Sequence, residues 1–163
     1  MAEWTARGRF PVPSDAETPF EADRWDGDAR FVIDRSEAGQ GASLRVHTDT
    51  SLSRGVALVR FPRNWTAYRY VRMEMPNPLP DQVDLNCRLH DGQHERRGPT
   101  YTDRCDTAFR VRPGWNSIRI DLGDVVKAPA GRRIEMEDIR GAIVFCSRLP
   151  VPRTIFIDDV RPE

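Results

Sequence analysis

Lysine is almost absent from this sequence. Lys127 is the single lysine, so 24 of the 25 basic residues are arginine. The basic residues are matched by 25 Asp and Glu, which gives a formal net charge of zero. Nucleic-acid binding draws on an excess of positive charge, so the balance argues against a nucleic-acid partner. The arginine bias fits codon usage, and it also fits a use for planar, bidentate guanidinium groups.

Long apolar runs are missing as well. The run from Ala142 to Cys146 is far too short to cross a bilayer, so we expect no membrane insertion. The first residues lack a basic segment followed by an apolar one, so the chain as given shows no signal peptide. Three cysteines and three histidines show no clustered zinc spacing. Apolar residues still make up 39% of the chain and recur in short segments, which favours a folded domain over disorder.

The sequence does contain many short apolar segments that end in Gly, Pro, Asn or Asp. No stretch of any length has helical periodicity, so this pattern predicts an all-β fold, an antiparallel β-sandwich jelly roll. Residues 1–18 are expected to be an N-terminal arm or linker, and residues 19–161 the sandwich. The expected strands are Ala29–Ser36, Ser43–Thr48, Val56–Phe61, Tyr68–Met75, Gln82–His90, Asp106–Arg112, Asn116–Leu122, Gly141–Arg148 and Thr154–Val160. One helical turn is expected at Ile134–Ile139.

Alternation along these strands predicts which side chains face outward. The outward positions share planar hydrogen-bonding or charged groups, and they are Tyr70, Arg72, Glu74, Asn86, Arg88, His90, Asp106, Arg110, Arg119 and Asp121. Brought onto one face, such groups would suit the hydroxyls and ring faces of a sugar. The alternative is a solvated face on which opposite charges pair across strands.

Several segments in order carry a resemblance to a known family. They are Pro19-Phe20-Glu21, Gly41-Ala42-Ser43-Leu44-Arg45-Val46, Gly55-Val56-Ala57-Leu58, Phe61-Pro62-Arg63-Asn64-Trp65, Tyr68-Arg69-Tyr70-Val71-Arg72, Leu89-His90-Asp91, Tyr101-Thr102-Asp103-Arg104, Pro113-Gly114-Trp115-Asn116-Ser117-Ile118-Arg119-Ile120 and Ile155-Phe156-Ile157-Asp158-Asp159-Val160. Over residues 18–161 the chain resembles the galactose-binding-like jelly-roll carbohydrate-binding modules of bacterial polysaccharide-acting or VanZ-like proteins. The resemblance implies an extracellular or cell-surface location and tethering to other domains.

The resemblance also implies a ligand surface and a structural calcium. The ligand-binding positions that it implies are Tyr70, Arg72, Asn86, Arg88, His90, Asp91, Tyr101, Asp103 and Arg104. An internal clamp, such as Asp91 with Arg104, is an alternative use of the same hairpin. The calcium positions are Glu21 and Asp159, with Asp23 and Asp158 as neighbouring candidates. Surface ion pairs with Arg24 or Arg161 are the alternative role of these acids.

The function expected from the residues and the resemblance is noncatalytic binding of a polysaccharide or oligosaccharide. The alternatives are a protein-interaction or structural β-sandwich domain of a multidomain surface protein, and a jelly-roll polysaccharide lyase or glycosidase. No pair of carboxylates stands out as the acid and base of a glycosidase, and no nucleophile motif is present. In a hairpin centred near Arg96, Cys87 and Cys105 would face one another, although three free, buried thiols are the simpler arrangement.

Overall fold

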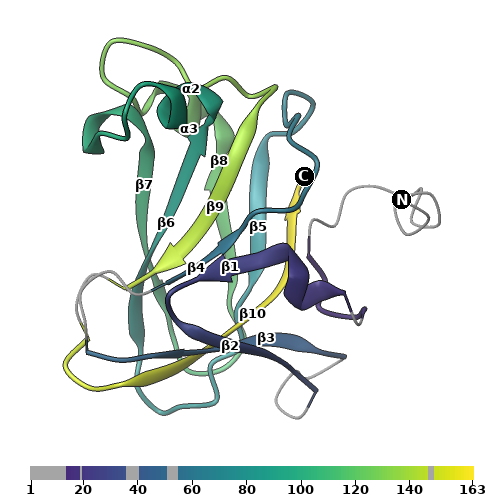
Figure 1. Ribbon diagram of the computed structural model, residues 1–163. Coiled ribbons are helices and arrows are strands. Elements are labelled where there is room, and N and C mark those ends of the chain that lie inside the picture. The colour runs from purple at the N-terminus through teal and green to yellow at the C-terminus, as the bar shows by residue number, and fades with distance from the viewer. Residues whose placement is uncertain (1–13, 19, 36–40, 51–54, 147–148) are drawn as a thin grey trace.

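Two five-stranded antiparallel sheets pack face to face (Figure 1). The computed structural model describes residues 14–18, 20–35, 41–50, 55–146 and 149–163. The first sheet contains, in spatial order, β1 (Trp25–Gly27), β4 (Gly55–Leu58), β9 (Ile139–Phe145), β6 (Val83–Asp91) and β7 (Cys105–Val111). The second contains β2 (Arg30–Asp34), β3 (Ser43–Thr48), β10 (Arg153–Pro162), β5 (Tyr70–Glu74) and β8 (Ser117–Asp121). The predicted β-sandwich is confirmed.

All nine expected strands form, and β1 is added to them. The expected helical turn at Ile134–Ile139 is wrong, because the chain makes a non-helical turn there before entering β9. The short helical segments are instead η1 (Glu21–Arg24), α2 (Gly92–Arg96), η2 (Tyr101–Asp103) and α3 (Leu122–Lys127). Helices α2 and α3 each begin after an aspartate whose carboxylate accepts a backbone N–H of the first turn. Among the described residues, no helix is long and apolar enough to cross a membrane.

The core lies between the two sheets. On β6, Val83, Leu85, Cys87 and Leu89 are all buried, as their alternation predicts. Strands β9 and β10, which are apolar on both faces, occupy the centres of their sheets. A strand flanked on both sides gains most from such a sequence, because its backbone and both of its faces are shielded.

The expectation of one polar outward face is wrong, because the outward residues divide between two faces. Strands β5 and β8 belong to the second sheet, whereas β6 and β7 belong to the first. Tyr70, Arg72 and Arg119 therefore lie on the opposite side of the sandwich from Arg88 and Arg110. Alternation within a strand fixes which residues point away from the core, but not which sheet the strand joins.

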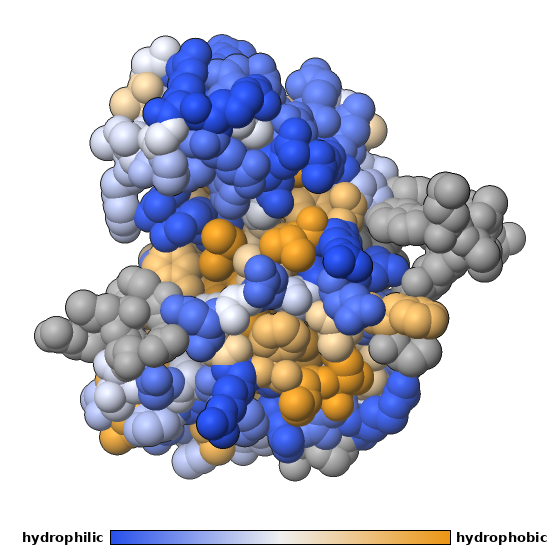
Figure 2. Space-filling view, in the orientation of Figure 1, coloured by the Kyte–Doolittle hydropathy of each residue, from blue (hydrophilic) through white to orange (hydrophobic). Residues whose placement is uncertain are grey.

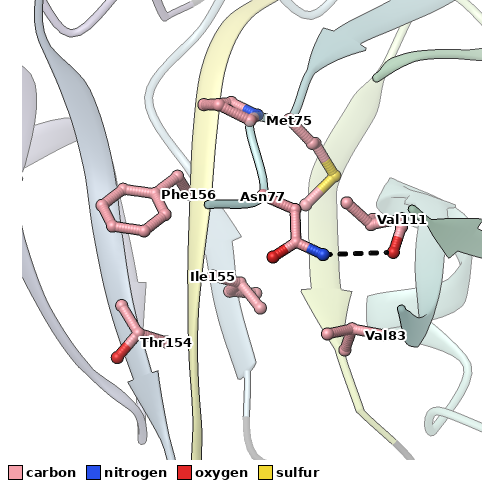
Figure 3. Close-up of a pocket in the computed structure, with 8 residues that line it drawn as sticks. Met75, Asn77, Val83, Val111, Thr154, Ile155 and Phe156 are labelled. Atoms are coloured by element: carbon pink, nitrogen blue, oxygen red, sulfur yellow. Dashed lines mark hydrogen bonds between the residues drawn. The ribbon is translucent and has the colours of Figure 1, made fainter. Parts of the chain in front are cut away.

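A small cavity lies in the interior, between the two sheets (Figure 3). Its volume is about 10 Å³, which suits at most one water molecule. Asn77 Nδ2 donates to the carbonyl of Val111 at 3.5 Å across it. Ile155 and Phe156 project to opposite sides of β10. This cavity is therefore too small to hold a sugar-sized ligand.

The cysteines are free and buried, as the simpler interpretation expects. In the β6–β7 pairing, Cys87 lies opposite Thr107 and Leu89 opposite Cys105, so the two thiols are diagonal neighbours rather than directly opposed. The expected facing pair is wrong, because the hairpin is centred one residue further along the chain. Burial, together with the nearby Cys105 and Asp106, raises the pKa of Cys87 to about 12, which makes its thiol unreactive.

The expected N-terminal arm, residues 1–18, falls mainly outside the described residues, since 1–13 are not among them. Ser14, within the described part, pairs with Val160 of β10 through backbone hydrogen bonds of 3.2 and 2.7 Å. Its hydroxyl also accepts the indole N–H of Trp25 at 3.0 Å. This residue of the expected arm therefore packs on the sandwich.

A buried carboxylate ties together the loops at one end of the first sheet. Asp91, at the end of β6, has no exposed surface and accepts hydrogen bonds from Arg132 Nη1 and Nη2 at 2.6 and 2.9 Å. It also accepts the backbone N–H of His94 at 3.0 Å and of Glu135 at 2.7 Å. Arg132 continues to Asp103, binding its carboxylate and its carbonyl. We call this set, Asp91, Arg132 and Asp103, the clamp.

We predict that Asp91→Asn costs about 3 kcal/mol of unfolding free energy at pH 7, because it leaves Arg132 buried without its full counter-charge. Burial acts to raise the pKa of Asp91, but the hydrogen bonds from Arg132, Glu135 and His94 outweigh it and lower the pKa to about 2. This stabilisation is therefore complete above about pH 4 and is lost as pH falls toward 2.

Urea unfolding at pH 7, 4 and 2.5 measures both effects. The control is Asp84→Asn, which removes an exposed ion pair with Arg110 and should change stability by less than about 0.5 kcal/mol. Equal losses in the two variants would contradict the assignment of Asp91 as the centre of the clamp.

Candidate functional site

A groove of about 230 Å³ lies on the outward face of the first sheet. Its lining comes from β1, β4, β6 and β9 and the turn after β1, and consists of Gly27, Asp28, Gly55, Ala57, Arg88, Ile143 and Phe145. Figure 2 shows apolar side chains in the middle of the view, below a more polar region, and a second apolar patch lower down. The groove is hollow because β4 presents only Gly55 and Ala57 there, beside the larger Ile143 and Phe145 of β9.

A row of side chains leads from the edge of the sheet into this groove. Tyr101 is 74% exposed, and the guanidinium of Arg104 lies 4.3 Å from its ring centroid. Arg104 Nε donates to Asp106 at 2.8 Å, and Arg88 Nε donates to the other oxygen of Asp106 at 3.4 Å. The Arg88 guanidinium then lies 5.3 Å from the centroid of Phe145. We call these five residues the aromatic–arginine row.

Asp106 holds both guanidinium groups of the row in place. Each arginine uses Nε for this carboxylate, which leaves the terminal nitrogens pointing elsewhere. Within the described residues, those of Arg88 have no hydrogen-bond partner. The side chain of Arg88 is 25% exposed, so its donors can meet a ligand. An aromatic ring at one end and fixed donors in the middle suit a molecule with both apolar faces and hydroxyls.

Asn86 and His90 lie on the same face of β6 as Arg88. Asn86 stands between Ala108 and Phe145 of the neighbouring strands. The ring of His90 packs against Gly141, where a Cβ would approach it to 2.6 Å, and its Nε2 lies 3.3 Å from Glu95. Burial lowers the pKa of His90, partly opposed by the bond to Glu95.

The sequence-predicted Asp91 and Asp103 lie in the clamp and not in the groove. Arg132 binds both carboxylates, so the expected Asp91–Arg104 contact is wrong; Arg104 pairs with Asp106 instead. Binding to Arg132 lowers the pKa of Asp103. The clamp supports the candidate site indirectly, because Asp103 ends η2, the segment that carries Tyr101.

Tyr70 and Arg72 are the predicted site residues that the fold separates from the groove. Arg72 pairs with Glu74 at 3.3 Å and with Asp159 at 3.1 Å on the second sheet. The ring of Tyr70 lies beside the guanidinium groups of Arg69 and Arg119, at 5.1 and 5.7 Å.

Sequence reasoning missed Phe145 and Arg132. Phe145 belongs to an apolar run, so its sequence is typical of a core residue. Its exposure to the groove depends on the small side chains of β4, the neighbouring strand. Arg132 lies in a turn and has no periodicity to mark it. Asp106 was expected to face outward, but its role between two arginines depends on the register of β6 and β7.

The proposed calcium positions have competing partners. Glu21 is fully buried, with Arg24 Nε 3.7 Å from its carboxylate. The carboxylate of Asp159 lies 3.1 Å from Arg72 and 3.0 Å from Arg161. The described residues contain no group of three or more acidic, histidine or cysteine side chains placed for a metal. Carboxylate oxygens are the ligand type that calcium prefers, but too few of them lie together here to hold the ion by side chains alone. The calcium site stays a prediction.

No protein-family model matches the sequence, and no curated protein matches it. Solved structures do match: a family 11 carbohydrate-binding module from Clostridium thermocellum, in complex with a β-1,3-1,4-mixed-linked tetrasaccharide, has a TM-score of 0.64 at 9% identity, covering 85% of this chain and 88% of that one. A family 28 module described as specific for non-crystalline cellulose has a TM-score of 0.62 at 14% identity, covering 96% of both chains.

An exo-β-agarase also matches, with a TM-score of 0.67 at 11% identity. The match covers 91% of this chain but only 24% of the agarase chain. At these identities the likeness establishes the fold, which is the jelly roll found in carbohydrate-binding modules.

We predict that Asp158→Asn stabilises the protein at neutral pH. Burial, with the like charges of Asp159, Glu17 and Asp15, raises the pKa of Asp158 to about 6. The folded state therefore holds a proton that the unfolded state releases, and stability falls as pH rises from about 4 to 6. Asparagine keeps the acceptor for the backbone N–H of Asp159 and removes the charge. After discounting for solvent screening, we expect a gain of about 1 kcal/mol at pH 7.

Thermal unfolding between pH 4 and 8 measures this gain. The temperature midpoint of unfolding should change less between pH 4 and 6 in the variant than in the parent. A variant that is less stable than the parent at pH 7, without added metal, would contradict the prediction.

Proposed function

We propose that this protein is a noncatalytic carbohydrate-binding module that holds a polysaccharide or oligosaccharide on the outward face of its first sheet. The observation that carries the proposal is the continuity of the aromatic–arginine row with the groove. Together, the row and the groove place an exposed ring, fixed guanidinium donors and a strip of small residues in one line across the strands.

Each part of the row has a role that suits a sugar. Tyr101 offers a ring face on which the apolar side of a pyranose can stack. Arg88 offers donors for hydroxyls, and Asn86 lies on the same face of β6. Gly55 and Ala57 let the chain of sugars approach the sheet closely. The network is largely organised before ligand arrives, because Asp106 already orients both arginines.

The alternatives fit the face less well. A glycosidase needs two carboxyl groups free to exchange protons across a cleft, but Asp106 on this face is engaged by two arginines. A protein-interaction surface is depleted in acidic residues at its centre, whereas Asp28 lines this groove.

The parent protein of such a module would have further domains. The matched agarase is several times longer than this chain, which supports attachment to a polysaccharide-acting enzyme. We propose a bacterial, extracellular or cell-surface setting on the same ground, with a VanZ-like parent as the other possibility that the sequence resemblance offers.

We predict that Arg88→Ala weakens retention on a bound polysaccharide at least tenfold, since it removes the central donors of the groove. Affinity electrophoresis in gels containing mixed-linked β-glucan, xylan, agarose or amorphous cellulose identifies the ligand first. Tyr101→Ala should reduce retention of the same polysaccharide through loss of stacking.

The matched control is Arg119→Ala, an arginine with an exposed side chain on the opposite sheet, paired with Glu163. It should leave retention unchanged. Loss of binding in Arg119→Ala with full binding in Arg88→Ala would move the site to the other face, and no retention on any polysaccharide would count against the function itself.

We propose separately that a calcium ion binds at the chain ends, drawing on Glu21 with Asp158 or Asp159 and on backbone carbonyls. Burial, with the like charges of Asp159, Glu17 and Asp15, raises the pKa of Asp158, and a bound cation would relieve the repulsion between these acids. Calcium at 100 times its dissociation constant should add about 2.7 kcal/mol to the stability. The midpoint of thermal unfolding, compared in calcium and in chelator, measures it; equal midpoints would contradict the site.

A further inference from the structure

Trp115 is an exposed aromatic residue held in one orientation. It lies in the turn between β7 and β8, and 55% of its surface is exposed. Its indole Nε1 donates to Glu74 Oε2 at 2.6 Å. Glu74 lies on the outward face of β5 and is itself buried. A buried carboxylate therefore fixes the position of an exposed ring.

Glu74 is fixed in turn by two other groups. The hydroxyl of Ser117 donates to its second oxygen at 2.9 Å, and Arg72 Nε lies 3.3 Å from the same oxygen. Hydrogen bonds to an ionised carboxylate, such as those from the indole of Trp115 and the hydroxyl of Ser117, are the stronger ones, and Arg72 adds an ion pair. Because its charge is balanced by Arg72, the carboxylate can stay buried while holding the indole.

The backbone beneath the ring is equally constrained. Asn116 Nδ2 donates to the carbonyls of Met75, Arg112 and Gly114, and its Oδ1 accepts the N–H of Arg112. Gly114 has a φ of 91°, a conformation that favours glycine, and exchanges two 2.8 Å backbone bonds with Asn77. A ligand that stacks on Trp115 would immobilise little that is not already fixed, so little entropy is lost on binding.

We propose that Trp115 is a second glycan contact, a stacking platform for one pyranose ring on the opposite side of the sandwich from the groove. This rests on the proposed function in one respect, namely that both contacts take the same class of ligand. The direct partners of the indole are polar: Glu74, with Ser117 and Arg72 behind it. An apolar ring edged by hydrogen-bonding groups matches a sugar, which presents C–H groups on a face and hydroxyls at its rim.

The experiment follows the indole N–H signal of Trp115 by nuclear magnetic resonance, assigned with Trp115→Phe. Xylo-, cello- and agaro-hexaose are titrated into the parent protein and into Arg88→Ala. We expect the Trp115 signal to shift in both proteins. Trp115→Ala should weaken retention on the matching polysaccharide about five- to tenfold through lost stacking. Trp115→Phe should keep most of it.

The control for Trp115→Ala is Val32→Thr, which removes another exposed apolar side chain from the far edge of the second sheet. It should leave retention unchanged, and all variants should keep the parent's unfolding midpoint to within a few degrees. A Trp115 signal that stays fixed while Arg88→Ala loses binding overturns the platform and leaves the groove intact. A shifted signal with no effect of groove variants supports the platform and overturns the groove. No response to any sugar at either place overturns both.

Discussion

The bidentate pair between Arg132 and Asp91 is the interaction on which the loops at one end of the first sheet depend. Asp91 ends β6, where it pairs with Ile139 of β9. From there its carboxylate organises the first turn of α2 and the backbone at Glu135. Four donors satisfy one buried charge, which is the condition for such a group to stabilise a fold rather than cost it. The loops beyond the sheet gain their order from this carboxylate.

The same pair reaches the proposed sugar site through Arg132. Its guanidinium also binds Asp103, the last residue of the short helical segment that begins with Tyr101. Tyr101 is highly exposed, and its ring is supported by Arg104. An exposed aromatic residue is useful as a stacking surface only if its backbone does not move on binding. The clamp holds the backbone of this segment through Asp103, and the guanidinium of Arg104 packs against the ring itself.

The fold could be predicted from the sequence more completely than the site. Short apolar segments with period-two alternation are a local property, so the nine strands and their inward residues follow from the chain alone. Assignment of strands to sheets is not local, and for that reason Tyr70 and Arg72 were expected beside Arg88 although they lie across the sandwich. Ion-pair partners are not a local property either: Asp91 pairs with Arg132, 41 residues away, and not with Arg104. The groove at Ala57 and Phe145 requires knowing that β4 pairs with β9.

The arginine bias gains a physical meaning from these contacts. Arg132 spans two aspartates, Arg88 and Arg104 share one, and Arg72 joins Glu74 to Asp159. Arg132 uses three donor nitrogens of one planar group for its two aspartates, which a lysine ammonium, as a single point charge, would not reproduce in the same geometry. A zero net charge built this way is a set of local, directed pairs. The distinctive features of the surface are then aromatic rings and a few guanidinium donors that the ion pairs do not use. A neutral, hydroxyl-rich ligand can bind to these groups without breaking the ion pairs.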